Sequence, residues 1–319
     1  MRVLVTGAAG LYGQHTIEAL ASSKSISRIY GFDDYSRGFP EEDLVLPCRS
    51  WGKVQISHQR FQETTVKELN SLNIDVVVHL AGYNSGKESC NTPEEYFLNN
   101  EYGTFKLMQT LTRTKNRPFF IYASTTEVYG EHVYSPIDEN HPVNPFNVHG
   151  VTKLAAEKHV LAASKGGNYP VAALRFSNTF GENQNICGYT SVIASFIDRA
   201  LRNEPLIIYG SGEQMRDFIY IKDAVNALTM VINKQHVAES TVFNIASGKL
   251  TSIALLAEKI IKLAGSTSEL IKLPCEKAEQ CGAPIATQLA HKALGWFPEV
   301  TLEDGLLHTI AWHKSVRSV

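Results

Sequence analysis

The sequence lacks a long hydrophobic run, because no apolar stretch of its 319 residues approaches the roughly 20 residues that a membrane-spanning helix needs. It also lacks a charge excess, since 30 Lys and Arg residues oppose 32 Asp and Glu residues, a formal net charge of -2. This balance gives no electrostatic reason to expect nucleic acid or a membrane as a partner. An anionic ligand must therefore be held by a few locally placed donors.

Cysteine is scarce, and the five cysteines are scattered along the chain. No pair has metal-ligand spacing, the eleven histidines form no HExxH motif, and the chain is too long to need a disulfide framework. The chain begins with a strand-like segment rather than a signal peptide. We therefore expect a protein without a metal, in the reducing cytoplasm.

The sequence does contain an alternation of short apolar runs and longer helical patterns, and 44% of its residues are hydrophobic. The apolar runs interpreted as strands are 2–5, 27–32, 75–80, 118–123 and 171–176. The segments with helical spacing are 11–21, 94–111 and 146–163. This alternation predicts βαβ units in a doubly wound parallel sheet of the Rossmann type, with helices on both faces.

The pattern becomes irregular after about residue 176. The elements expected there are a loop at 181–189, a turn at 210–212, a strand at 241–245 and helices at 252–264 and 301–312. We interpret residues 1–176 as the Rossmann domain and residues 177–319 as a smaller C-terminal α/β lobe, with some later segments interleaved into the first domain.

The strongest local signal is TGAAGLYG at residues 6–13, which follows a predicted strand and opens a predicted helix. Gly7 allows a tight turn, Gly10 lets the backbone approach a pyrophosphate, and Gly13 lets the helix pack closely on the strand. Leu11 and Tyr12 belong to the first helical turn and are included in the site. The segment predicts a dinucleotide site.

A carboxylate about 20 residues after the glycines is needed to hold the ribose hydroxyls. Asp33 lies there, at the end of the second predicted strand, and Asp34 follows it. Two acids would repel a 2′-phosphate, so NAD is predicted over NADP. Arg37 is the one feature against this preference.

Three further segments line up with the glycine motif, namely STTEVYG at 124–130, HGVTK at 149–153 and QMRDF at 214–218. Together they resemble the extended short-chain dehydrogenase/reductase family, in particular its NAD-dependent nucleotide-sugar epimerases, dehydratases and decarboxylases. The likeness runs almost end to end. Its other segments are HLAG at 79–82, NEYGT at 100–104, LRFSNTFG at 174–181, RDFIYIKD at 216–223 and ALGWFPEVTLEDGL at 293–306.

In the family that this chain resembles, bound NAD takes a hydride from the sugar, usually at C4, and later returns it. A Tyr-x-x-x-Lys pair on one helix and a nearby Ser or Thr handle the hydroxyl proton. The resemblance implies that Thr125 hydrogen-bonds the reacting hydroxyl, and that Lys153 binds the nicotinamide ribose and tunes the base. The remaining assignments that it implies are Leu80, Ala81, Gly82 and Asn100 for the cofactor and Thr126, Asn178 and Arg216 for the substrate.

The sequence departs from the family at the tyrosine position, which His149 occupies. Histidine is a credible base near neutral pH, and Lys153 follows on the same helix face, where its charge favours a neutral ring. Three interpretations stay open. His149 replaces tyrosine as the acid/base, or proton transfer has moved to Tyr129, Glu127 or a water chain, or oxidation at C4 is lost.

Glu127 bears on the reaction type, because a Thr-x-Glu-Val-Tyr-Gly segment is common among family dehydratases and decarboxylases, where the acid lies near C5. Dehydratases usually carry Asp where this chain has Thr126, and epimerases can also carry the Glu. The expected function is therefore epimerisation of a nucleotide sugar, a UDP-sugar first of all, through a transient 4-keto intermediate. A lyase using Glu127 and a catalytically silent NAD- or sugar-nucleotide-binding protein are the alternatives.

Two further expectations follow from the resemblance. Arg216 matches the family arginine that clamps the diphosphate, since a guanidinium fork suits phosphate, although an ion pair with Asp217 is the alternative. A second family arginine, in an RPG-like stretch, is replaced by Cys-Gly-Ala-Pro at 281–284. Family members usually pair through two long helices, here 94–111 and 146–163, so a homodimer is expected.

Overall fold

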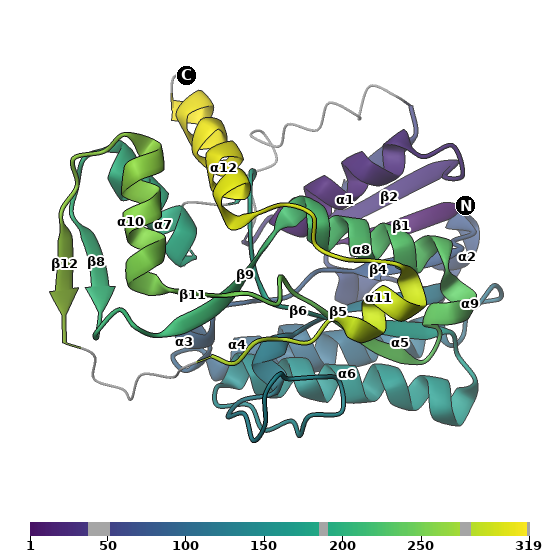
Figure 1. Cartoon of the computed structure of the whole chain (residues 1–319). Coiled ribbons are helices and arrows are strands. Elements are labelled where there is room, and N and C mark those ends of the chain that lie inside the picture. Colours follow the sequence, from purple (N-terminus) through teal and green to yellow (C-terminus); the bar gives the residue numbers. More distant parts are fainter. Residues whose placement is uncertain (38–51, 185–190, 275–281, 318–319) are drawn as a thin grey trace.

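A computed structural model describes residues 1–37, 52–184, 191–274 and 282–317 of the chain (Figure 1). Its centre is a seven-stranded, wholly parallel sheet. The strands, in spatial order, are β10 (Thr241–Ile245), β6 (Val171–Phe176), β5 (Phe119–Thr125), β4 (Val76–His79), β1 (Arg2–Thr6), β2 (Arg28–Asp33) and β3 (Val54–His58). The predicted doubly wound parallel sheet is confirmed.

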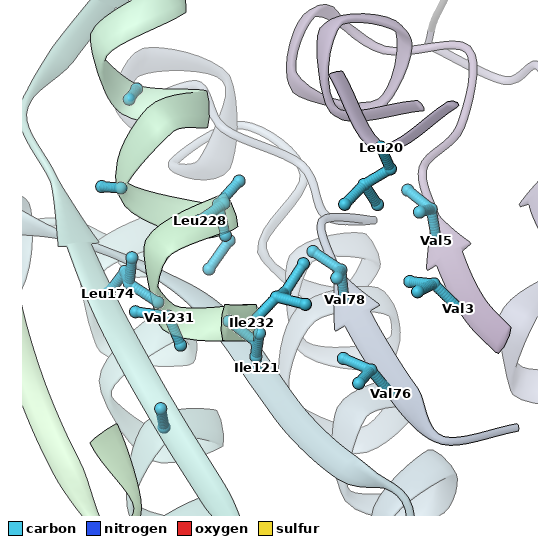
Figure 2. Close-up of a cluster of buried hydrophobic side chains, with 14 of the residues drawn as sticks. Val3, Val5, Leu20, Val76, Val78, Ile121, Leu174, Leu228, Val231 and Ile232 are labelled. Carbon is cyan, nitrogen blue, oxygen red and sulfur yellow. The ribbon is translucent and has the colours of Figure 1, made fainter. Parts of the chain in front are cut away.

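The central strands are buried on both faces, as near-continuous apolar runs require. Because side chains alternate along a strand, Val3 and Val5 contact one helical layer and Leu4 contacts the other. On the Val3 face, Leu20 and Leu228 pack against the sheet (Figure 2). The helices of this layer are α1 (Leu11–Ser22), α8 (Ile221–Asn233), α9 (Gln235–Ala238) and α11 (Gln288–Leu294).

The opposite face is covered by the remaining helices of the first half of the chain, of which α6 is the longest (Figure 1). They are α2 (Val66–Leu72), α5 (Gly103–Leu111) and α6 (Val148–Gly167). The helix expected at 94–111 is continuous, but it consists of α4 (Pro93–Tyr96), a π-helical segment η4 (Phe97–Tyr102) and α5. Short pieces complete this half, namely η3 (Phe61–Glu63), α3 (Gly86–Ser89) and η5 (Thr126–Val128).

A second lobe packs beside the sheet and has its own core, built around Phe180, Phe196, Leu256 and Ile310 (Figure 1). Its strands form a three-stranded sheet of β11 (Leu250–Ser252), β9 (Met215–Tyr220) and β7 (Asn178–Phe180), and a pair of β12 (Leu270–Leu273) and β8 (Leu206–Tyr209). Its helices are α7 (Val192–Leu201), α10 (Ile253–Ala264) and α12 (Leu302–Arg317). Within the described ranges, none of the helices combines the length and apolar character of a membrane span.

Candidate active site

A cavity of about 750 Å³ lies at the carboxyl edge of the large sheet. Its walls come from the segments that follow β1, β2, β4, β5 and β6. The strand order reverses between β1 and β4, and open α/β sheets bind ligands at such a switch point. The topology therefore places candidate residues from five separate segments around the same cavity.

The three motif glycines shape one end of this cavity, and each has a different reason to be glycine. Gly7 has φ of +73°, and a Cβ there would lie 2.7 Å from the backbone nitrogen of Ala81. A Cβ on Gly13 would lie 2.0 Å from the carbonyl oxygen of Gly7, so only glycine lets α1 pack this close to β1. At Gly10, by contrast, the one atom within 4 Å of an added Cβ would be that same oxygen, at 3.4 Å.

The start of α1 fits a pyrophosphate. Gly10 is the N-cap of the helix and lines the cavity, as do Leu11, Tyr12 and Gly13 of the first turn. First-turn amides have no partner inside their own helix, and no described side chain caps them. These N–H groups and the helix dipole favour an anionic group at this point.

Asp33 lies at the end of β2 and lines the same cavity. Its Oδ2 accepts from the amide of Ala9 at 2.8 Å, and its Oδ1 accepts from the amide of Tyr35 at 2.8 Å. Burial raises the pKa of the Asp33 carboxyl, and these two hydrogen bonds oppose the shift. The carboxylate is thereby fixed beside the glycine turn, where the ribose of a dinucleotide is expected.

Arg37, the residue that argued against NAD, is engaged by carboxylates. Its guanidinium forms an ion pair with Glu88 and a second one, at 3.5 Å, with Glu95. It also lies over the ring of Tyr83, 4.2 Å from the ring centre. Asp34 forms an ion pair of its own, with its Oδ2 3.6 Å from Nε of Arg60. Acidic side chains thus surround the cation that a 2′-phosphate would need.

The HLAG segment also reaches the cavity, through Leu80, Ala81 and Gly82. Asn100 does not line it. The Asn100 side chain is buried and holds the next loop, since it accepts from the amide of Tyr83 at 2.8 Å and donates to the Tyr83 carbonyl at 2.9 Å. The structure therefore shows Asn100 as a support for the cavity wall.

The four candidate catalytic residues, Thr125, Glu127, His149 and Lys153, all line the large cavity. His149 and Lys153 share the first turns of α6, as their spacing predicts. The ammonium of Lys153 donates to the carbonyl of Ala123. Burial lowers the pKa of Lys153 to about 7, against the opposing effect of the Glu157 carboxylate.

Glu127 and His149 are in direct contact, which the sequence spacing did not reveal. Nδ1 of His149 lies 3.2 Å from Oε2 of Glu127, and the Asn147 amide donates to the same oxygen at 2.9 Å. Partial desolvation alone would raise the pKa of Glu127, whose side chain is 43% exposed. The hydrogen bond and charge of His149, the hydrogen bond from Asn147 and the charge of Arg216 outweigh it, so the pKa is lowered. Glu127 is therefore a carboxylate at neutral pH.

Tyr129, one of the alternative proton acceptors, is not part of this group. It is buried, and its hydroxyl donates to Oδ1 of Asn244 at 2.6 Å. Burial raises the pKa of Tyr129 to about 12. Tyr129 is not among the described residues that line the large cavity, so the structure does not favour it as the proton acceptor.

The candidate substrate residues divide between two cavities. Thr126 lines the large one, whereas Arg216 lines a second cavity of about 270 Å³ in the smaller lobe. Asn178 lines both and donates to the carbonyl of Asp217 at 3.0 Å. The Asp217 carboxylate is buried and accepts from Ser177 and Ser247.

Two residues that the sequence analysis did not single out complete the site. Asn147 is the N-cap of α6 and could have been found by its capping position. Ser124 lines the large cavity and donates to Glu157 at 2.6 Å, a contact that carries no sequence signal. Of the segment at 281–284, Cys281 lies outside the described residues.

Residues 3–246 match the model of the NAD dependent epimerase/dehydratase family. The chain belongs to this family. The family that the motifs resembled is thus confirmed, and with it the expectation of an NAD-dependent enzyme. The uncapped start of α1, the space beside Gly10 and the fixed carboxylate of Asp33 fit that cofactor.

Relatives align with the chain along nearly its whole length. A putative UDP-glucose 4-epimerase of Methanocaldococcus jannaschii is 30% identical over 98% of both chains. A human dTDP-D-glucose 4,6-dehydratase is 29% identical over 98% of this chain and 90% of its own. A solved UDP-glucuronic acid 4-epimerase from Bacillus cereus, in complex with UDP-glucuronic acid and NAD, superposes with a TM-score of 0.90. It is 28% identical and covers 99% of this chain and 100% of its own.

Proposed function

We propose that the chain is an NAD-dependent epimerase that inverts one carbon of a UDP-sugar through a transient 4-keto sugar. The observation that carries this proposal is the placement of Thr125, His149 and Lys153 in one cavity with the glycine turn and Asp33. Relatives described as UDP-sugar 4-epimerases align over the full length of the chain. When bound, NAD supplies the hydride acceptor and, later in the turnover, the hydride donor.

Three side chains of the cavity have separate roles in proton transfer, substrate binding and cofactor binding. His149 accepts the proton of the reacting hydroxyl and later returns it, because loss of the hydride requires loss of that proton. Thr125, whose Oγ1 accepts from the amide of Glu127 at 3.2 Å, can donate its own proton to the sugar oxygen. Lys153 holds the cofactor side of the cavity from the same helix face as His149.

The smaller cavity would hold the nucleotide. Arg216 supplies a guanidinium for phosphate, and the apolar walls include Phe196, Ile207 and Phe218. Asn178 lies at both cavities, so a sugar in the large one and a nucleotide in the small one can belong to one ligand. A diphosphate bridging the two would lie beside Asn178.

The test is direct incubation of the purified protein with NAD and UDP-glucose, UDP-glucuronic acid and UDP-N-acetylglucosamine in turn, with products read by mass and by proton NMR. The proposal expects a product of unchanged mass and inverted configuration. In the variant His149→Ala the rate should fall about 100-fold, whereas His132→Ala, at an exposed loop histidine, should leave it unchanged. No product with any sugar, or an unchanged rate in His149→Ala, contradicts the proposal.

A lyase is the second candidate, and the presence of Glu127 in the cavity favours it. The same incubations distinguish the two reactions. Loss of water or of carbon dioxide from the sugar identifies a lyase, and retention of mass identifies an epimerase.

We further propose that the enzyme is a cytoplasmic homodimer paired through η4 and α6. Large apolar side chains are 45–48% exposed on these two neighbouring segments, namely Phe97, Leu98, Tyr102 and Val151. Burial of such a patch by a second copy removes it from water. Cys90, the cysteine within the described ranges, has an exposed free thiol, which suits a reducing compartment.

A further inference from the structure

We infer that Glu127 is a positioning residue that acts through His149, and that the two side chains form a dyad in which Glu127 leaves Nε2 of the ring as the working base. The inference rests on the proposed function, because it needs His149 to handle the sugar proton. In this role Glu127 acts on the base, whereas in the lyase alternative it would act on the sugar itself.

The contact between the two side chains fixes the tautomer of the ring. A carboxylate can only accept hydrogen bonds, so the Nδ1 atom that lies 3.2 Å from Oε2 of Glu127 must carry the hydrogen. In the neutral ring the lone pair is then on Nε2. The opposite tautomer would place two lone pairs against each other.

Asn147 fixes the position of the Glu127 carboxylate relative to the His149 ring. Its side-chain nitrogen donates to Oε2 of Glu127 at 2.9 Å, while its Oδ1 accepts from the amide of Gly150 at 2.8 Å and caps α6. The acid is therefore tied to the first turn of the helix that carries His149. The lowered pKa of Glu127 agrees with a carboxylate that stays ionised in this position.

The surroundings of the ring leave Nε2 for the substrate. His149 is 4% exposed and lines the large cavity, and among the described residues no protein group bonds Nε2. Tyr96 from α4 lies edge-on to the ring, but its hydroxyl donates to Glu88. Lys153 follows on the same helix face, and the charge of Arg216 from β9 acts on the Glu127 carboxylate.

The dyad also balances the charge that the reaction creates. As the hydride leaves the sugar carbon, the hydroxyl proton moves to Nε2 and the ring becomes an imidazolium. The carboxylate of Glu127 then faces a full positive charge, and the proton returns to the sugar oxygen in the second half of the turnover. An acid that orients a histidine and stabilises its charged form serves catalysis without touching the substrate.

The arrangement bears on the choice between epimerase and lyase. One oxygen of Glu127 already accepts two hydrogen bonds, from His149 and from Asn147. This oxygen, Oε2, is thereby held against the base and not against the sugar. In this chain, the Glu127 of the segment that suggested a lyase would thus support the base of an epimerase.

The experiment compares Glu127→Ala and the isosteric Glu127→Gln with wild type, and uses Glu131→Gln as the matched control at an exposed loop carboxylate. The first readout is the ring ¹⁵N NMR signal of His149, assigned by its loss in His149→Tyr. Wild type and Glu127→Gln should show Nδ1–H, because the Gln carbonyl can still accept, and Glu127→Ala should shift toward Nε2–H. Glu131→Gln should match wild type.

The second readout is the pH–rate profile with a UDP-sugar. We expect kcat to fall about 100-fold in Glu127→Ala with KM within about three-fold of wild type. In Glu127→Gln the acidic limb of the profile should move to lower pH, because the imidazolium has lost its counter-charge. A role confined to loop structure would leave both the tautomer and the profile unchanged.

The two readouts distinguish failure of the dyad from failure of the proposed function. If wild type converts sugars while Glu127→Ala keeps the wild-type tautomer and Glu127→Gln keeps the wild-type pH profile, the dyad is wrong and the epimerase proposal stands. If no sugar is converted but the tautomer depends on Glu127, the proposed function fails and the dyad geometry stands.

Discussion

At the scale of single residues, the structure sets the function of Lys153 against stability. Its side chain is buried, and burial lowers its pKa from 10.5 in the unfolded chain to about 7. Between these two values the unfolded state binds more protons than the folded state, so folding becomes more favourable as the pH rises. The cost of burying this charge is therefore fully present below pH 7 and disappears toward pH 10.

Replacement of Lys153 by Met should remove that cost together with the catalytic function. We expect the melting temperature of Lys153→Met to exceed that of wild type by several degrees at pH 6, with the difference shrinking toward pH 10. The variant also loses the hydrogen bond to Ala123, but this loss is the same at every pH. It therefore shifts the stability difference between variant and wild type without changing its dependence on pH. Calorimetry from pH 6 to pH 10 measures this, and a difference that does not vary with pH would contradict the assigned pKa.

The sequence identifies the type of chemistry residue by residue, but not the contacts among side chains. Gly7, Asp33 and the pair His149–Lys153 could be predicted because their spacing along one chain segment determines their geometry. The contact of Glu127 with His149 joins residues on two different segments, and it depends on how the end of β5 packs against α6. No spacing rule encodes it.

At the scale of elements, the turn from β1 into α1 yields a prediction with an internal control. A Cβ at Gly10 would touch only the Gly7 carbonyl oxygen, at 3.4 Å, on the wall of the cavity, so Gly10→Ala should fold as well as wild type and bind NAD at least about ten-fold more weakly. A Cβ at Gly13 meets backbone at 2.0 Å, so Gly13→Ala should push α1 from β1 and lower stability by about 1–3 kcal/mol. Calorimetric titration with NAD and thermal melts measure the two effects, and equal melting losses in both variants would contradict the assignment.

The elements that sequence analysis identified are those with strong local patterns. The strand expected at 171–176 is β6 with the same bounds, since every one of its residues is buried. The edge strand β3 was not predicted, because its partly exposed residues show no clean apolar pattern. The strand at 241–245 was expected, but its pairing with β6 in the large sheet is a long-range contact that periodicity does not report.

At the scale of the whole molecule, the exposed apolar side chains on η4 and α6 lead to a prediction about assembly. Leu98 and Tyr102 lie one helical turn apart on η4, which packs against α6, and both are nearly half exposed. A charge at each position would have to be buried without a partner in the proposed homodimer. The double variant Leu98→Lys/Tyr102→Lys should therefore be monomeric where the wild type is dimeric.

Light scattering after gel filtration measures the mass of each form. The matched control is Leu307→Lys, at an equally exposed leucine on α12, which Figure 1 shows well away from α6. This control should remain a dimer, because a lysine at an ordinary solvent-facing site costs little. Because the large cavity and the smaller cavity are both lined by residues of one chain, the monomeric variant should still bind NAD. A wild type that runs as a monomer, or a double variant that stays dimeric, would show that the two copies do not meet at this surface.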